Sequence, residues 1–336
     1  MKTFSELMSD NDFVNRVVEI INRTEGEKYS IPTNKPDLYR YMKISEDAVN
    51  DITNNRITVT SVKEYNDMFD GGMCIYSDEE QLSKLVEDDL EELRKFGIET
   101  NSFEESSRYY FETEADLKRR TIDYMGAHLC CFSPVDSSVL MWAHYGNSNR
   151  GICVKYDFNG ETNPLNLYTF PVAYRDKPIN VSSLLYKKDP DYPYSIELAV
   201  MISILCKSLE WKYENEWRFI SPLFPDSDKR SRYQLINLPR INELIFGFHF
   251  LRNCYGDNWE IGVQNINKLV DYSLNNNVPV FIMLQGVGRF EMIKQKIDPA
   301  KVSLFMKRNF VKKRNDEHLY HVMQKSFMRD VCGYNK

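Results

Sequence analysis

The segment from Trp211 to Ile220 constrains the fold more than any other part of this sequence. Aromatic and charged residues alternate along it with a repeat of two residues. Such a repeat is typical of a β-strand, whose successive side chains point to opposite faces of a sheet. The pattern therefore predicts a strand with one aromatic face and one charged face. The aromatic residues are Trp211, Tyr213, Trp217 and Phe219, and the charged residues are Lys212, Glu214, Glu216 and Arg218.

Two carboxylates share the charged face of this predicted strand. Glu214 and Glu216 would lie roughly 6.5 to 7 Å apart along the strand, with Lys212 and Arg218 beside them. At that spacing, both carboxylates can contact one ligand. A surface strand with paired charges explains the same pattern without a ligand, because such charge ladders are common and stabilise a sheet modestly.

Strand and helix patterns alternate along the rest of the chain and predict an α+β fold. Strand patterns cover residues 38–42, 57–60, 127–132, 152–158, 172–175, 244–248 and 280–284. Helix patterns cover residues 10–22 and begin again at Ser45, at Ser77 and at Ser195, where the last helix is apolar on most of its circumference and should be buried. The polar stretch 24–37 reads as a linker. These patterns predict an N-terminal helix within residues 1–30, a single α+β core domain over 31–300 with a helical insertion at about 77–120, and a basic C-terminal segment over 301–336.

Composition excludes several classes of protein. With 42% apolar and 27% charged residues, the chain is neither disordered nor fibrous. Seven scattered cysteines without a Cys-x2–4-Cys pair argue against a disulfide framework or a zinc ribbon. Because no apolar run is long enough for a secretory signal or a membrane span, we expect a cytoplasmic protein with no membrane partner.

Charge is unevenly distributed. The chain carries a formal charge of −6, yet residues 301–336 hold nine basic and three acidic residues. A basic tail can steer a protein toward nucleic acid or an acidic partner. It lacks the interleaved aromatic residues that stack on single strands, so a solvated helix face explains it equally well and nucleic acid is not indicated.

Three further motifs carry candidate site residues. A short helix before Gly146 brings Trp142 and Tyr145 onto one face. The cluster Tyr-Asn-Asp-Met-Phe-Asp-Gly-Gly contains Asn66, and a turn explains its composition without a ligand. Arg40 alternates with tyrosines in a strand pattern, and a buried arginine requires an anion.

In this order the motifs resemble the bacterial family called domain of unknown function 2971. The motifs are Leu-Tyr-Arg-Tyr, Tyr-Asn-Asp-Met-Phe-Asp, Leu-Met-Trp-Ala-His-Tyr-Gly with Arg-Gly-Ile-Cys-Val, Pro-Val-Ala-Tyr, and Lys207 with Trp-Lys-Tyr-Glu-Asn-Glu-Trp-Arg. The resemblance runs from about Pro36 to Gly247. Met68 departs from it, because the family tends to have proline there.

The family in turn resembles ADP-ribosyltransferases, whose fold is a split, mostly antiparallel β-sheet core with flanking helices. By that resemblance the cofactor would be NAD, and the protein would be a transferase or NAD glycohydrolase of a bacterial or phage-related toxin or defence system. Arg40 would bind the NAD phosphates, with Asn66 and Arg218 also in the binding site. Trp142 or Tyr145 would pack on the nicotinamide. The catalytic residues would be Glu216, which stabilises the ribose cation, Glu214, which orients a macromolecular acceptor, and Tyr145.

Two other functions fit the same residues. A non-catalytic module could bind a nucleotide or a partner protein in the same cleft, with Glu214, Glu216 and Arg40 in internal ion pairs. A hydrolase or nuclease could use Asp67, Asp70 and Glu216 with a divalent ion, because carboxylates suit magnesium. The distances among Arg40, Tyr145 and Glu216 should separate a nucleotide site from a plain α+β core.

Overall fold

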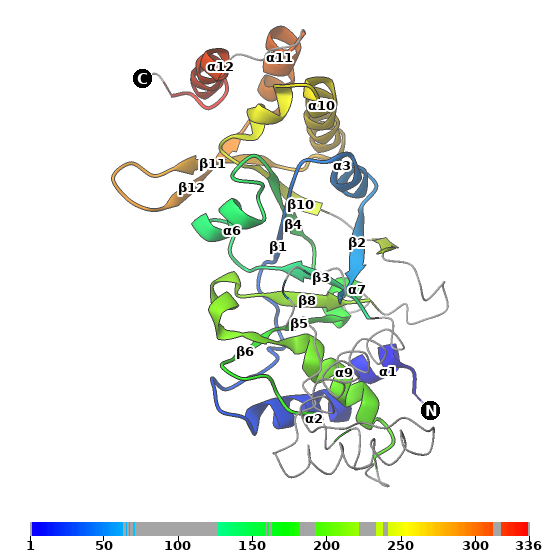
Figure 1. Cartoon of the computed structure of the whole chain (residues 1–336). Coiled ribbons are helices and arrows are strands. Elements are labelled where there is room, and N and C mark those ends of the chain that lie inside the picture. The colour runs from blue at the N-terminus through cyan, green and yellow to red at the C-terminus, as the bar shows by residue number, and fades with distance from the viewer. Residues whose placement is uncertain are drawn as a thin grey trace, which may run out of the picture.

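Two five-stranded sheets form the centre of the structure (Figure 1). The computed structural model describes residues 2–62, 65, 67, 70, 127–158, 160, 163–181, 184, 192–221, 233–237, 241–311 and 317–334. The first sheet has the order β1 (Tyr39–Met42), β4 (Ile152–Tyr156), β10 (Ile241–Phe246), β11 (Val280–Gln285) and β12 (Met292–Ile297). The second has the order β5 (Thr169–Pro171), β8 (Trp217–Ile220), β3 (His128–Phe132), β2 (Arg56–Ser61) and β9 (Tyr233–Asn237).

Most strand pairs in these sheets are antiparallel. The exception in the first sheet is the parallel pair β10 and β11, and the second sheet is antiparallel throughout. A small parallel pair joins β6 (Ala173–Arg175) to β7 (Cys206–Ser208). The predicted α+β fold with mostly antiparallel strands is confirmed.

Among the described residues, one isolated backbone bridge links the two sheets, between β1 and the residue after β3. The Tyr39 amide donates to the Ser133 carbonyl at 2.8 Å, and the Ser133 amide donates to the Tyr39 carbonyl at 2.9 Å. This junction positions the candidate site.

Helices at one end of the molecule cover the first sheet (Figure 1). They are α3 (Glu46–Thr53), η3 (Phe250–Cys254), α10 (Trp259–Asn276), α11 (Pro299–Asn309) and α12 (Glu317–Asp330). Helix α3 begins as the sequence predicts, since the Ser45 hydroxyl accepts from the Ala48 amide and two acids occupy the first turn. In α10, Ile266, Leu269 and Val270 face the apolar core of this half.

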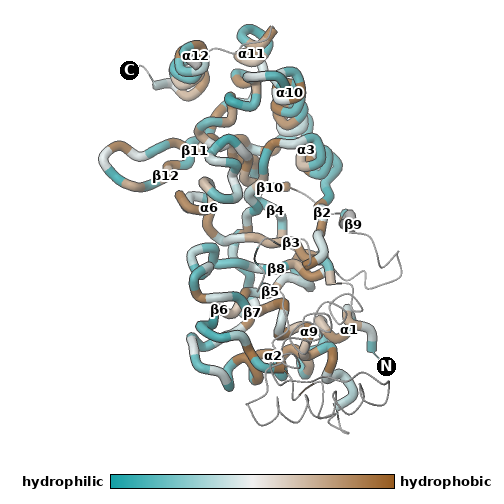
Figure 2. The backbone as a smooth tube through the Cα atoms, viewed as in Figure 1, coloured by the Kyte–Doolittle hydropathy of each residue, from teal (hydrophilic) through white to brown (hydrophobic). Residues whose placement is uncertain are grey.

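Helices α1 (Phe4–Met8), α2 (Asn11–Asn22) and α9 (Ser195–Leu205) cover the second sheet at the other end, where Figure 2 shows hydrophobic segments. All of α9 except Ile196 and Glu197 is buried, which confirms the prediction. Each fully buried leucine or isoleucine stabilises the fold by roughly 1.5–3 kcal/mol. Helix α9 is therefore a rigid support for β7, which follows it directly.

Several predicted segments differ from the structure. The predicted strand over 211–220 is wrong in its first half, which is the 3-10 helix η2 (Leu209–Glu214). Asn215 then adopts a left-handed conformation with φ of 46°, which asparagine tolerates, and β8 follows. Strands β5, β7, β9 and β12 were not predicted. All of the predicted insertion at about 77–120 lies outside the described residues, as does Asn66.

The predicted linker over 24–37 is anchored to the core. Tyr29 is buried, and its hydroxyl donates to the Pro171 carbonyl at 2.9 Å. The side-chain amide of Asn22, at the end of α2, donates to the Tyr29 carbonyl and accepts from the Tyr29 backbone amide. Among the described residues, no helix is both long and apolar enough to cross a membrane.

Candidate functional site

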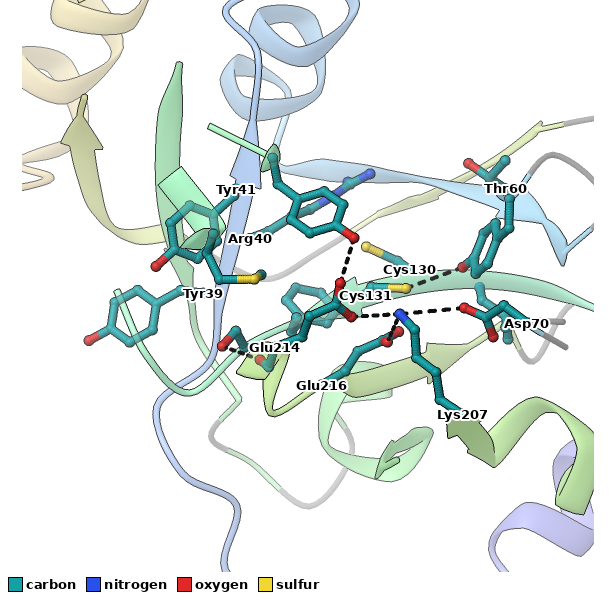
Figure 3. A pocket seen from close by; sticks show the side chains of 16 residues that line it. Tyr39, Arg40, Tyr41, Thr60, Asp70, Cys130, Cys131, Lys207, Glu214 and Glu216 are labelled. Atoms are coloured by element: carbon teal, nitrogen blue, oxygen red, sulfur yellow. Dashed lines mark hydrogen bonds and ion pairs between the residues drawn. The ribbon is translucent and has the colours of Figure 1, made fainter. Parts of the chain in front are cut away.

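A cavity of about 360 Å³ lies at the junction of the two sheets (Figure 3). A cavity of this size is in the range of small-molecule sites. Its walls come from β1, β2, β3, β7, η2 and the residue after α6 (Val139–His144). The lining residues are Tyr39, Arg40, Tyr41, Thr60, Tyr65, Asp70, Leu129, Cys130, Cys131, Phe132, Ser133, Met141, Tyr145, Lys207, Glu214 and Glu216.

Lys207 connects three carboxylates in one wall of the cavity (Figure 3). Its Nζ lies 2.5 Å from Oε2 of Glu214, 2.8 Å from Oε2 of Glu216 and 3.5 Å from Oδ2 of Asp70. Only 7% of the lysine side chain is exposed. Because these charges are removed from water, their mutual attraction is stronger than on the surface.

Arg218 completes this group from β8. Its Nε lies 2.7 Å from Oε1 of Glu216, and its Nη2 lies 2.7 Å from the Asp70 carboxylate. Its Nη1 donates to the Ile204 carbonyl at the end of α9. The arginine is fully buried and lies behind the carboxylates, outside the cavity lining. We call Asp70, Glu214, Glu216, Lys207 and Arg218 the carboxylate cluster.

The two glutamates of the cluster differ in acidity. Burial alone would raise the pKa of Glu216, but Arg218 and Lys207 lower it well below its ordinary value. Burial raises the pKa of Glu214, and Lys207 and Tyr145 offset only part of that effect. Glu216 is therefore a fixed anion, whereas Glu214 is the more readily protonated of the two.

Tyr145 reaches the cluster from the C-terminal end of α6. Its hydroxyl donates to Oε1 of Glu214 at 2.5 Å, so both oxygens of this carboxylate have partners. Burial is the main cause of the raised pKa of the Tyr145 phenol, and the hydrogen bond to Glu214 raises this pKa further. The phenol is therefore a hydrogen-bond donor at neutral pH.

The loop after Tyr145 has a backbone conformation that accounts for the asparagine and glycine residues in this part of the motif. Asn147, Ser148 and Asn149 all have positive φ, at 50°, 54° and 62°. A Cβ on Gly151 would lie 2.2 Å from the Met42 carbonyl oxygen, so only glycine fits this approach to β1. These residues shape the turn that leads from α6 into β4 and so place Tyr145.

Arg40 lines the cavity from β1. Its Nη2 donates to the Thr58 carbonyl at 3.2 Å, whereas its buried Nη1 has no hydrogen-bond partner among the described residues. An unsatisfied buried donor of this kind costs about 1–3 kcal/mol. Arg40 is thus a buried cation with a donor that has no hydrogen-bond partner among the described residues.

Other predicted residues lie outside the cavity lining. Trp142 is fully buried beneath Tyr41, with ring centroids 5.2 Å apart, and its indole donates to the Asp136 carbonyl. Its contact with the cavity is therefore indirect, through Tyr41. Asp67 is described but is not part of the lining, whereas Asp70 belongs to the cluster.

Three residues that support the glutamates had no role assigned from sequence. Lys207 was visible only as part of a motif. The Ser133 hydroxyl donates to the Glu214 carbonyl at 2.7 Å, and the Tyr174 hydroxyl accepts from the Glu216 amide at 2.8 Å. No local pattern distinguishes such residues, because their partners are distant in the sequence.

Thiols also line the cavity, but they are poor nucleophiles. Burial raises the pKa of Cys130, and it raises that of Cys131 well above the ordinary value. A thiolate is the reactive form of cysteine, so these thiols are inert in this setting. In the part of the chain that the structure describes, no group of three or more His, Cys, Asp or Glu residues is placed to hold a metal ion.

The segment from α6 to β8 matches a known family model, described as Protein of unknown function (DUF2971), over residues 141–219. Over these residues the chain is similar to that family. The DUF2971 segment supplies Tyr145, Lys207, Glu214, Glu216 and Arg218, which is most of the charged wall. Comparisons with curated proteins and with solved structures found no match.

Proposed function

We propose that the cavity binds NAD and that the protein is an ADP-ribosyltransferase or NAD glycohydrolase with an ADP-ribosyltransferase-like fold. The observation that carries this proposal is that Arg40, Tyr145, Glu214 and Glu216, from four separate segments, all line one cavity. An arginine on an early strand and two glutamates before a late strand follow the order of residues in that enzyme class. The split between the two sheets also suits this fold.

Each side chain has a role in the proposed reaction. Arg40 would bind a phosphate, and Tyr145 would contact the nicotinamide. Cleavage of the bond between ribose and nicotinamide sends the electron pair to nicotinamide and leaves positive charge on the ribose. Glu216, held ionised by Arg218, would stabilise that charge more in the transition state than in the ground state.

The acceptor side of the reaction would involve Glu214. The nucleophile, water or a group on a macromolecular acceptor, forms the new bond to the ribose carbon and gives up a proton. Glu214 can orient this nucleophile, and its raised pKa suits it to take the proton. Each ionised carboxylate oxygen has two lone pairs, so contacts to Lys207 and Tyr145 leave acceptor positions open.

The proposed reaction has a direct test in nicotinamide release from NAD. Glu216→Gln should lower the release rate at least about 100-fold, since charge stabilisation of this kind is typically worth 10²–10³ in rate. Glu210→Gln is the matched control, because Glu210 is an exposed carboxylate on η2, the helix just before Glu216. Circular dichroism checks that both variants fold. Full turnover in Glu216→Gln would refute the assignment.

A non-catalytic nucleotide- or partner-binding module is the second candidate. One observation favours it, namely that both oxygens of Glu216 are already ion-paired, to Arg218 and Lys207. Calorimetry distinguishes the two functions. Binding of NAD without nicotinamide release, even with cell lysate supplied as acceptor, would favour the module.

Setting and biological role are proposals of the same kind. All six described cysteines are free, which fits the reducing cytoplasm where NAD is abundant. Consumption of NAD would suit a bacterial or phage-related toxin or defence effector. Neither proposal requires a membrane or a nucleic-acid partner.

A further inference from the structure

Lys207 has a position in the cavity that no sequence pattern revealed. It is the one residue, among those described, whose charged group contacts all three carboxylates of the cluster. Arg218 contacts Glu216 and Asp70 but has no contact with Glu214. The ionisation of Glu214 therefore depends on Lys207 more than on any other cation nearby.

We propose that Lys207 is a positioning residue that keeps Glu214 ionised and directed at Tyr145, so that the charged wall of the cavity keeps its geometry. Within the cluster, the three carboxylates are in contact with two cations, Lys207 and Arg218. Loss of Lys207 leaves Arg218 as the one cation of the cluster for three buried carboxylates.

The backbone around Lys207 explains why this lysine can hold its position. It lies in β7, directly after the buried helix α9, and pairs with Tyr174 of β6. Its ammonium group also lies 5.0 Å from the centre of the Trp211 ring. A long side chain fixed at both ends loses little further entropy when it pairs with the carboxylates.

Glu214 is the group expected to respond when Lys207 is removed. Burial already raises its pKa, and Lys207 is the largest influence that lowers it. Without the lysine, Glu214 should take up a proton at neutral pH, because one cation cannot balance three buried carboxylates. The titratable groups that face Glu214 are Lys207 of β7, Tyr145 after α6, Tyr174 of β6, Tyr213 of η2 and Glu216 before β8.

Infrared spectroscopy at pH 7 tests this role without any ligand. Lys207→Met should show an absorption band of a buried protonated carboxyl that is absent from the unmodified protein, and Lys207→Arg should not. The added variant Glu214→Gln in the Lys207→Met background should remove the band. Lys212→Met is the matched control, because Lys212 is an exposed neighbouring lysine that pairs with Glu27.

Stability measurements cover the case in which the single variant folds poorly. Lys207→Met should unfold at lower denaturant concentration. Glu214→Gln in that background should restore part of the loss, because the amide is buried without the proton uptake that the carboxyl needs at pH 7. If Lys207→Met does not fold, the double variant should. Absence of the band in a folded Lys207→Met, or failure of the double variant to recover stability, would overturn the proposal.

The effect on ligand binding rests on the proposed function, whereas the effect on Glu214 does not. Calorimetry with ADP-ribose should show at least tenfold weaker binding to Lys207→Met at pH 7, because Glu214 and Tyr145 are no longer held in place. Lys212→Met should bind normally. If the unmodified protein binds neither ADP-ribose nor NAD while the infrared result holds, the proposed function fails and the role of Lys207 stands.

Discussion

The two walls of the cavity are built in opposite ways. On the wall formed by β7, η2 and β8, every charged group of the carboxylate cluster has a partner of opposite charge. On the wall formed by β1 and β3, Arg40 stands among tyrosines and thiols, and its Nη1 has no hydrogen-bond partner among the described residues.

The difference indicates that the carboxylate cluster supports the structure of the cavity, whereas Arg40 is a candidate for ligand recognition. Every member of the cluster is paired without a ligand, so its members hold one another in place. Arg40 has no ion-paired carboxylate among the described residues, although Asp51 is near enough to raise its pKa. A ligand that supplied an acceptor would recover the cost of its unsatisfied donor. Substitution of Arg218 should therefore lower stability, whereas substitution of Arg40 should weaken ligand binding.

The largest effect is expected for Arg218→Met. It leaves Glu216 and Asp70 with one cation fewer in a buried site, which should lower the free energy of unfolding by about 3–5 kcal/mol. Denaturant titration at pH 7 measures the loss. Arg23→Met is the control, since Arg23 forms an exposed pair with Glu19 on α2 and should change stability by less than about 0.5 kcal/mol.

The pH dependence of this loss gives a second check. In the unmodified protein, the lowered pKa of Glu216 stabilises the fold above the unfolded value of about 4.3, and this stabilisation disappears as the pH falls through the folded value. In Arg218→Met the pKa of Glu216 should rise, so the variant's loss in free energy of unfolding should be smaller in acid. An equal loss at pH 7 and pH 4 would contradict the ion-pair explanation.

The next effect is expected for Arg40→Met, and it concerns binding instead of stability. Removing a cation that lacks part of its hydrogen bonding should change the free energy of unfolding by less than about 1 kcal/mol. Affinity for ADP-ribose should fall roughly 10- to 100-fold, because a charged hydrogen bond contributes about 1.5–3 kcal/mol. A loss of stability as large as that of Arg218→Met would mean that both walls are structural.

Much of the sheet could be predicted, because repeats of two residues mark its core strands. The pattern failed at 211–220, where a 3-10 helix, a left-handed Asn215 and a short strand produce the same alternation as one strand. Strand β12 escaped prediction because it is polar and half exposed, with little apolar contrast between its faces.

The candidate site was harder to predict than the fold. Arg40, Tyr145 and the two glutamates were each chosen from local motifs, but their meeting depends on pairing between strands far apart in the sequence. Lys207 and Arg218 show the limit most clearly. A lysine or arginine at a strand looks the same in sequence whether it faces solvent or, as here, a buried carboxylate.

The smallest effect is expected at the contact between α6 and the charged wall. Tyr145→Phe removes the hydrogen bond to Glu214 and should lower the free energy of unfolding by about 1 kcal/mol at pH 7. That bond lowers the pKa of Glu214, so its loss should raise the pKa further.

The sign of the pH effect follows from this shift. A carboxyl whose folded pKa is raised destabilises the fold when it ionises, so the Tyr145→Phe deficit should be largest at pH 7 and shrink toward pH 4. Denaturant titration at both pH values measures it, with the exposed Tyr334→Phe as control. A deficit that is constant with pH would show that the phenol contributes packing alone and that Glu214 is held by Lys207 without its help.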